Sequence, residues 1–345
     1  MRRIAVAGHI CLDITPTITD SARLDPGHLI EVGRMAVTVG GSVGNTGRTL
    51  AALGAEVVAL ANVGNDELGQ IVHSILAEDD HLDAQLSVIS GSSTSYSLVF
   101  EPAGLDRTFW HHVGANADFD GTKISMDDVD IFHLGYPPLL PALFRDDGAP
   151  LHDLLTRARA AGAITSVDLA VVDPASVAGG AEWSTVLRAM AEQTDIVSPS
   201  LDDLTSALHI DAPFSTDLVN ELAELLLEWG VAVAAISAGE NGLFIRTAGS
   251  ARFAGPTLSG LSATWANRSL DVPPVSLDTP VTTNGAGDAS TAGLLFALST
   301  GATLDQAASL AAACSSAVLT GRVQSPSIIT AMRPPLAELF HEVSA

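Results

Sequence analysis

A glycine-rich turn near the C-terminus carries the residue types that chemistry on phosphate needs. Gly285, Ala286 and Gly287 have almost no side chain, so a ligand can approach their backbone closely. Asn284 is a typical helix N-cap residue, and the apolar residues from 291 to 298 predict a helix behind the turn. The unpaired N–H groups and the positive dipole end of such a helix form an anion site.

Asp288 lies one turn into this predicted helix, beside the anion site. A carboxylate that can take a proton next to an anion site is what phosphoryl transfer to a hydroxyl requires. The alternative is an ordinary glycine-rich turn with an acidic residue that favours the helix start. For the turn by itself the ordinary interpretation is preferred, so a choice between the two interpretations needs signals from the rest of the chain.

The charge of the chain argues against several classes of partner. With 40 Asp and Glu against 16 Lys and Arg, the net charge is −24, so nucleic acid and anionic membranes are not expected as partners. Lys123 is the only lysine, which excludes a P-loop lysine and leaves backbone amides, a metal ion or an arginine to bind phosphate. No apolar run is long enough to span a bilayer, and the short apolar N-terminus predicts a strand rather than a signal peptide. We therefore expect a cytoplasmic protein.

The length of 345 residues and the hydrophobic fraction of 47% allow one large α/β domain with an attachment, or two ordinary domains. The two cysteines, Cys11 and Cys314, are interpreted as buried thiols, and a single disulfide between them stays open. The adjacent His111 and His112 favour a surface or loop position over a metal site, because no HExxH-type partner accompanies them.

A second glycine-rich stretch lies near the N-terminus. Gly40 and Gly41 precede a predicted helix from Thr46 to Leu53, and Asn45 offers both a donor and an acceptor. Asp13 follows the first predicted strand, where α/β proteins bind ligands. A glycine-rich connector and a solvated turn aspartate are the plain alternatives. The stretch is not a dinucleotide fingerprint, because GxGxxG is absent.

Alternating predicted strands and helices indicate an α/β fold, and polar residues at the strand ends, such as Asp168 and Ser237, predict one extended cleft. Two segments read instead as a small sheet that interrupts this pattern twice, which is how a lid is built into a chain. The expected division is a core of residues 1–13, 41–91 and 114–345 and a lid of residues 14–40 and 92–113. Arg107 in the lid could reach a phosphate, although a surface arginine is the ordinary interpretation. An apolar lid face needs covering, so a homodimer through the lid is a hypothesis.

The ordered set of motifs resembles the PfkB/ribokinase family of small-molecule kinases. Gly40-Gly41-x-x-x-Asn45 is similar to the N-terminal signature of that family, and Asn-Gly-Ala-Gly-Asp-Ala at residues 284–289 is similar to its C-terminal signature. Three shorter motifs follow in the expected order, at residues 63–69, 114–116 and 239–242. Each motif is weak by itself, but the ordered set is specific and covers about residues 4–321.

The resemblance implies a ribokinase-like three-layer α/β/α sandwich with a small β-sheet lid. It also implies ATP-dependent phosphoryl transfer, with Mg²⁺, to a hydroxyl of a small sugar or nucleoside. Asp288 would be the general base, and the amides of the 285–287 turn would hold the developing charge. The residues implied for the acceptor are Asp13, Gly40, Gly41, Asn45 and Asn116; those implied for the nucleotide are Ser200, Ser237, Gly239, Gly242 and Asn284; and Asp203 is implied for the metal.

Two positions depart from the family pattern. Thr282 stands where the family often has an aspartate that helps to hold a monovalent cation, so dependence on such a cation is open. Ser200-Leu201-Asp202-Asp203 stands in place of Asn-x-x-Glu near the metal and keeps a carboxylate on a shorter arm. A sugar kinase is therefore the leading hypothesis. A nucleoside kinase and a non-catalytic sugar or nucleotide sensor are the alternatives, and a Rossmann oxidoreductase is discounted for lack of the fingerprint.

Overall fold

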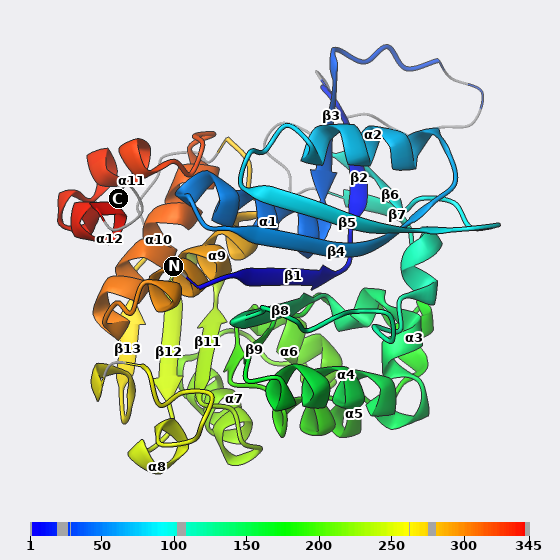
Figure 1. Cartoon of the computed structure of the whole chain (residues 1–345). Helices are drawn as coiled ribbons and strands as arrows, with labels where there is room; N and C mark the ends of the chain where they lie inside the picture. The colour runs from blue at the N-terminus through cyan, green and yellow to red at the C-terminus, as the bar shows by residue number, and fades with distance from the viewer. Residues whose placement is uncertain are drawn as a thin grey trace.

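A nine-stranded sheet lies at the centre of the computed structural model, which describes residues 2–18, 27, 29–101, 108–261, 263–274 and 281–341 (Figure 1). The strands of this large sheet are, in spatial order, β13 (Ser269–Val272), β12 (Leu243–Thr247), β11 (Val233–Ser237), β10 (Ile196–Val197), β9 (Ile164–Val167), β8 (Ile131–Gly135), β1 (Ile4–Gly8), β4 (Val57–Gly64) and β5 (Leu82–Ile89). Neighbours from β11 to β5 are parallel, whereas β12 and β13 are antiparallel additions at one edge.

The sequence of β1 explains why the sheet must be covered on both sides. All five of its residues are buried, and they are apolar or glycine. Ile4 and Val6 contribute to the core on one face, while Ala5 and Ala7 contribute to the core on the other. A strand whose side chains are apolar on both faces of the sheet needs a layer of helices on each face, as parallel sheets do.

Two layers of helices supply that cover (Figure 1). One core joins the sheet to α1 (Gly41–Leu53), α2 (Glu67–Leu76), α9 (Ala286–Ser299), α10 (Leu304–Leu319), α11 (Pro326–Met332) and α12 (Glu338–His341). The other core joins it to α3 (Pro141–Phe144), α4 (Ala149–Ala160), α5 (Trp183–Ala191), α6 (Leu201–Ala207) and α7 (Thr216–Glu228), and α8 (Ser250–Phe253) is a short helix after β12. The predicted three-layer α/β/α sandwich is confirmed. No helix within the described ranges combines the length and the apolar character that a membrane span needs.

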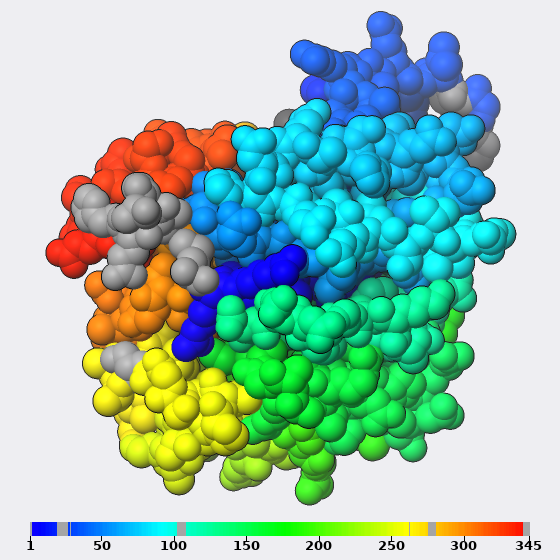
Figure 2. Space-filling model, in the orientation of Figure 1, coloured from blue at the N-terminus to red at the C-terminus, as the bar shows by residue number. Residues whose placement is uncertain are grey.

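A second, four-stranded sheet confirms the predicted small sheet. Its order is β3 (Met35–Gly40), β2 (Cys11–Pro16), β6 (Tyr96–Phe100) and β7 (Thr108–His112). The blue segment that includes β2 and β3 projects beyond the rest of the surface in Figure 2. Asp13 follows β1, as expected, but it lies within β2 of the small sheet because the chain enters that strand after only two residues, and the alternative of a solvated turn aspartate was wrong. Arg107 and the expected turn at 102–104 lie outside the described residues.

Other local predictions differ from the structure in their boundaries. Helix α1 begins at Gly41, five residues before the predicted start at Thr46, so Asn45 is a helical residue. Gly54 ends this helix in the left-handed conformation (φ 97°), as its position indicated. Strand β5 was missed, although its alternation of apolar and polar residues is the pattern of a strand with one covered face. Cys11 and Cys314 are both free and buried, which confirms the prediction of two buried thiols.

Close packing of α9 on α10 fixes the position of the glycine-rich turn at the start of α9. A Cβ atom added at Gly293 would lie 2.9 Å from the backbone of Ala311 and from the carbonyl oxygen of Leu310. These contacts are with backbone atoms, so the neighbouring helix would have to move. Glycine at position 293 therefore sets the distance between the two helices.

We predict that Gly293→Ala destabilises the fold by about 1–3 kcal/mol, the usual cost of overpacking, despite the better helix propensity of alanine. The free energy of unfolding in urea measures this loss. Gly180→Ala is the matched control, because an added Cβ there has no atom within 4 Å. Equal unfolding midpoints for the two variants would contradict the packing argument.

Candidate functional site

The carboxylate of Asp288 is held by donors from two other parts of the chain. Asp288 lies in the first turn of α9 and is 6% exposed. Its Oδ2 accepts a hydrogen bond from Nδ2 of Asn45 at 3.0 Å. Its Oδ1 accepts one from Oγ1 of Thr46 at 3.1 Å and one from the phenol of Tyr136 at 2.5 Å. Burial raises the pKa of Asp288, and the hydrogen bonds from these three donors oppose that rise.

The turn before α9 has a different cap from the predicted one. Gly285 is the N-cap residue, in the left-handed conformation (φ 77°) that glycine adopts without strain. The predicted N-cap role of Asn284 was wrong. Nδ2 of Asn284 instead donates to Oδ2 of Asp13 at 3.2 Å, and its backbone N–H donates to Oγ1 of Thr282 at 3.1 Å. The turn is thereby connected to strand β2 of the small sheet.

Asp13 and the double glycine form one compact group. Asp13 is 4% exposed, and its Oδ1 accepts a hydrogen bond from the thiol of Cys11 at 3.3 Å. Burial raises the pKa of Asp13, and the hydrogen bonds from Cys11 and Asn284 oppose that rise. A side chain at Gly40 would collide with the Asp13 carboxylate, and a Cβ at Gly41 would lie 2.6 Å from the ring of His9. Glycine at these positions therefore lets Asp13 approach the start of α1.

Asn116 is fully buried, and both ends of its amide bind the backbone of Ile10. Nδ2 donates to the Ile10 carbonyl at 2.8 Å, and Oδ1 accepts from the Ile10 N–H at 3.4 Å. In this geometry Asn116 fixes the segment between β1 and β2. That segment leads directly to Asp13, so Asn116 holds the backbone that precedes Asp13.

Two histidines and a serine extend this group across the two sheets. Nε2 of His9, after β1, lies 3.4 Å from Nε2 of His111 in β7, and Nδ1 of His111 lies 3.1 Å from Oγ of Ser97. Burial lowers the pKa of His111 to about 4, so the ring is neutral at pH 7. His111 thus contacts the site, whereas a surface or loop position was expected. Among the described residues, no cluster of three or more His, Cys, Asp or Glu side chains is arranged to hold a metal ion directly.

Three buried carboxyls influence one another near the turn. Burial raises the pKa of Asp168, at the end of β9, well above its usual range, and the charges of Asp288 and Asp203 raise it further. Burial also raises the pKa of Asp203 to about 6; hydrogen bonds from Ser200 oppose that rise, and the charges of Asp202 and Asp288 add to it. Mutual repulsion of this kind makes these carboxyls hold their protons to higher pH than usual.

The Ser200–Asp203 segment also has a structural role at the start of α6. Ser200 Oγ accepts the N–H of Asp203 at 3.1 Å, and Oδ2 of Asp203 accepts the N–H of Ser200 at 2.7 Å. This reciprocal arrangement is a capping box. The Ser-x-x-Asp spacing could have predicted it, with aspartate in the place of the usual glutamate.

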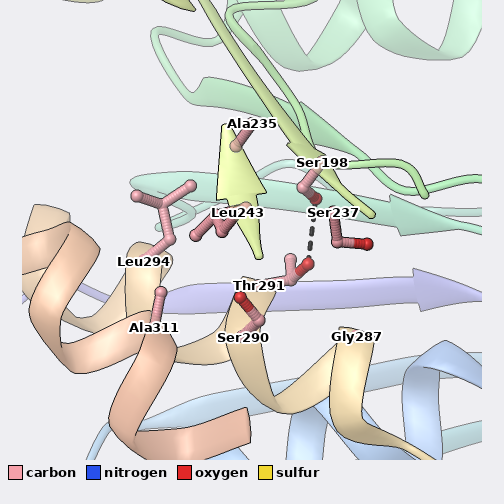
Figure 3. Close-up of a pocket in the computed structure, with 9 residues that line it drawn as sticks. All are labelled: Ser198, Ala235, Ser237, Leu243, Gly287, Ser290, Thr291, Leu294 and Ala311. Carbon is pink, nitrogen blue, oxygen red and sulfur yellow. Dashed lines mark hydrogen bonds between the residues drawn. The ribbon is translucent and has the colours of Figure 1, made fainter. Parts of the chain in front are cut away.

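A pocket begins at Gly287, next to Asp288 (Figure 3). It lies between the first turns of α9, the strands β11 and β12, and α10. A hydrogen bond of 3.0 Å from Thr291 to Ser198 crosses it. Its residues are Ser198, Ala235, Ser237, Leu243, Gly287, Ser290, Thr291, Leu294 and Ala311. The polar side chains lie toward Gly287, and the apolar ones close the other end.

Ser237 and the following loop lie beside this pocket. Ser237 ends β11, and its N–H donates to the carbonyl of Pro199 at 2.9 Å, next to Ser200. Gly239 (φ 53°) and Gly242 (φ 99°) bracket the loop that leads into β12, which confirms the predicted hairpin. The structure therefore brings Ser200, Ser237 and the 239–242 loop together on one side of Asp288, and Asp13, Gly40, Gly41 and Asn45 together on the other.

Four residues that contact the site were not singled out from the sequence: Tyr136, Thr46, His9 and Ser97. Tyr136 directly follows β8, so the rule that ligand contacts gather at the ends of parallel strands could have found it. Thr46 follows Asn45 and needed only an earlier start for α1. His9 and Ser97 carry no such signal, because their meeting depends on the pairing of the two sheets.

Comparisons with known proteins bear on the family of the chain and on its fold. A family model described as pfkB family carbohydrate kinase matches residues 1–330. The bifunctional protein HldE of Caulobacter vibrioides is 28% identical over 330 residues, which is 90% of this chain and 58% of that protein. The chain therefore spans less than two thirds of the length of that relative.

Solved structures share the fold. The adenosine kinase of Sinorhizobium meliloti matches with a TM-score of 0.72 and 21% identity over 97% of this chain and 99% of that one. The ribokinase of Arabidopsis thaliana, solved with ribose and ATP, matches with a TM-score of 0.67 and 17% identity over 99% of both chains. Because the family model covers residues 1–330, the chain belongs to the pfkB family of carbohydrate kinases.

Proposed function

We propose that this chain transfers the γ-phosphoryl group of ATP to a hydroxyl of a small sugar, with Asp288 as the general base. The observation that carries the proposal is the position of the Asp288 carboxylate. It is buried, it lies in the first turn of α9 directly after the glycine-rich turn, and it is held by donors from α1 and from the end of β8. Family membership supports the reaction class, and the ribokinase complex with ATP supports the phosphoryl donor.

The two sides of Asp288 suggest separate places for the two substrates. Asp13, Gly40, Gly41 and Asn45 would bind hydroxyls of the acceptor, and Asn116 would hold the backbone beneath them. The nucleotide would lie along the pocket that begins at Gly287, against Ser200, Ser237, Gly239 and Gly242, with Asn284 at the junction of the two substrates. The space inside this pocket is about 10 Å³, too small for a base, so the nucleotide would lie along its open polar side.

The start of α9 would stabilise the charge that develops during transfer. The first amides of a helix have no carbonyl partner within the helix, so the N–H groups of Gly285, Ala286 and Gly287 are suited to phosphate oxygens. The N–H of Ala286 would have to exchange its long hydrogen bond to the Thr283 carbonyl, at 3.4 Å, for a phosphate oxygen. Asp288 would accept the proton of the attacking hydroxyl, which makes the hydroxyl oxygen a better nucleophile. The buried position of the carboxylate excludes bulk water from this proton transfer.

Mg²⁺ fits the hard oxygen ligands near the nucleotide side. The described carboxyls do not converge closely enough to hold an ion directly, so Asp203 would hold it through water. The bound ion would neutralise phosphate charge during transfer. Thr282 has no carboxylate; its hydroxyl donates a hydrogen bond to Glu101, which follows β6, at 3.4 Å. Rates measured in K⁺ and in Na⁺ would show whether the enzyme needs a monovalent cation.

We predict that Asp288→Asn lowers kcat by about 10²–10⁴-fold, the range for loss of a general base. The assay is ADP release with a saturating sugar acceptor. The fold should be retained, since asparagine has the same shape, and circular dichroism checks this. Asp153→Asn is the control, because the Asp153 side chain is 81% exposed on α4. Unchanged turnover in Asp288→Asn would remove the assignment.

An acceptor panel tests the substrate class. We predict that ADP release depends on a sugar, measured for purified enzyme with Mg²⁺ and a series of pentoses, hexoses and nucleosides. Turnover with nucleosides only would show that the acceptor is a nucleoside and not a sugar. The similarity in fold to an adenosine kinase is the reason for testing this alternative. A ligand-induced rise in melting temperature without any turnover would favour a non-catalytic sensor.

We also propose that the small sheet, acting as a lid over residues of the core, pairs with a second copy of the chain. Its described surface exposes Met35 (56%), Trp110 (48%) and nearby Val32 (47%), large apolar side chains that a partner would cover. Sedimentation should therefore show a dimer at micromolar concentration. Trp110→Lys should weaken it by at least tenfold, whereas Val177→Lys, also exposed but after β9 on the core, should not. A monomeric wild-type chain at high concentration would end this proposal.

A further inference from the structure

The two oxygens of Asp288 are used unequally. Among side-chain donors, Thr46 and Tyr136 both bind Oδ1, whereas only Asn45 binds Oδ2. The backbone N–H of Asp288 also bonds to its own carboxylate. An ionised carboxylate has about four lone-pair sites, two on each oxygen. Side chains of the chain itself therefore occupy both sites on Oδ1 but only one on Oδ2, which is the oxygen that these side chains leave more open.

The position of Tyr136 keeps its phenol protonated and directed at Asp288, so its hydrogen bond to that carboxylate is maintained. It directly follows β8, and its ring packs 5.6 Å from the ring of His9, centroid to centroid. Burial raises the pKa of the Tyr136 phenol well above its usual value, and the charges of Asp288 and Asp168 raise it further. The phenol thus keeps its proton and can only donate to the carboxylate. A donor to an ionised acceptor makes one of the stronger hydrogen bonds in proteins.

We propose that Tyr136, together with Thr46, is a positioning residue that fixes Oδ1 of Asp288 and leaves Oδ2 to take the proton of the acceptor hydroxyl. This inference rests on the proposed phosphoryl transfer. In the step, the proton moves from the acceptor hydroxyl to Oδ2 while the acceptor oxygen bonds to the γ-phosphorus. The bond between that phosphorus and the bridging oxygen breaks, and ADP leaves with the electron pair.

The surroundings of Asp288 make its donors necessary. Asp13 and Cys11 in β2, Asp168 after β9 and Asp203 in α6 all interact with Asp288 electrostatically. Negative charge on any of them disfavours a second charge on Asp288, and burial disfavours it as well. Hydrogen bonds donated by Tyr136, Thr46 and Asn45 act in the opposite direction. Removal of one donor should therefore leave the base protonated over a wider range of pH.

The first experiment compares pH profiles of kcat for the wild type, Tyr136→Phe and Tyr96→Phe. The acidic limb reports ionisation of the base, so loss of a hydrogen bond to the ionised form should move this limb to higher pH by about one to two units. Most of the activity lost at pH 7 should return at alkaline pH. Tyr96→Phe removes the other tyrosine hydroxyl of the chain, from strand β6, and should leave the limb unchanged.

Thr46→Val removes the second donor to Oδ1 and should shift the limb in the same direction. Thermal unfolding shows whether Tyr136→Phe folds properly. If it does not, Thr46→Val alone tests the proposal. A loss of kcat by a constant factor at every pH would reduce Tyr136 to a packing role and overturn the proposal. An unshifted acidic limb in both variants would overturn it too.

A second measurement does not depend on turnover. With ¹³C-labelled aspartate, the carboxyl signal that disappears in Asp288→Asn can be titrated directly. We expect its midpoint to rise in Tyr136→Phe relative to the wild type and to Tyr96→Phe; an equal midpoint would overturn the inference. A wild-type chain without kinase activity on any acceptor would refute the proposed function and the proton-transfer step, while a shifted midpoint would still establish Tyr136 as the group that holds Asp288.

Discussion

A buried carboxylate at the start of α9 is the constraint on which the rest of the site depends. An ionised carboxylate removed from water is costly unless it is fully hydrogen-bonded, and the side-chain donors that hold Asp288 come from outside its own helix turn. They come from Asn45 and Thr46 of α1 and from Tyr136 after β8, which are more than 150 residues away in sequence. α1 and α9 must therefore share one face of the sheet, and β8 must end beside them. The strand order that places β1 between β8 and β4 meets this requirement.

The same group of residues joins the small sheet to the large one. Asp13 in β2 accepts a hydrogen bond from Asn284 of the turn, and His111 in β7 contacts His9 after β1. Glycines 40 and 41 allow this approach, because a side chain at either position would occupy the space of Asp13 or His9. The group around Asp13 is thus shared by both sheets, whereas the pocket that begins at Gly287 is formed by the large sheet and its helices. In the proposed reaction the small sheet would cover the acceptor on its own side of Asp288.

Much of the architecture was predictable because its signals are local. The apolar β1, the α10 helix from Leu304 to Leu319 and the left-handed Gly54 each follow from a short stretch of sequence. Predictions failed where a long-range contact replaced a local one. Asn284 is of a residue type that often caps helices, but its side-chain amide binds Asp13, 271 residues away, and Gly285 is the N-cap residue instead. The early start of α1 likewise brings Asn45 and Thr46 to Asp288, 243 and 242 residues away.

The sequence by itself determined the class of the fold, the family, and the chemical types at the turn: small residues for a bound anion and a carboxylate for a proton. It could do so because these properties belong to single residues and to short spacings. The tertiary structure decided which groups surround that carboxylate, namely Tyr136, Thr46, Asp168 and Asp203. These neighbours set how readily Asp288 ionises and which of its oxygens stays available. Burial and hydrogen bonding are properties of the packed environment, and sequence spacing does not encode them.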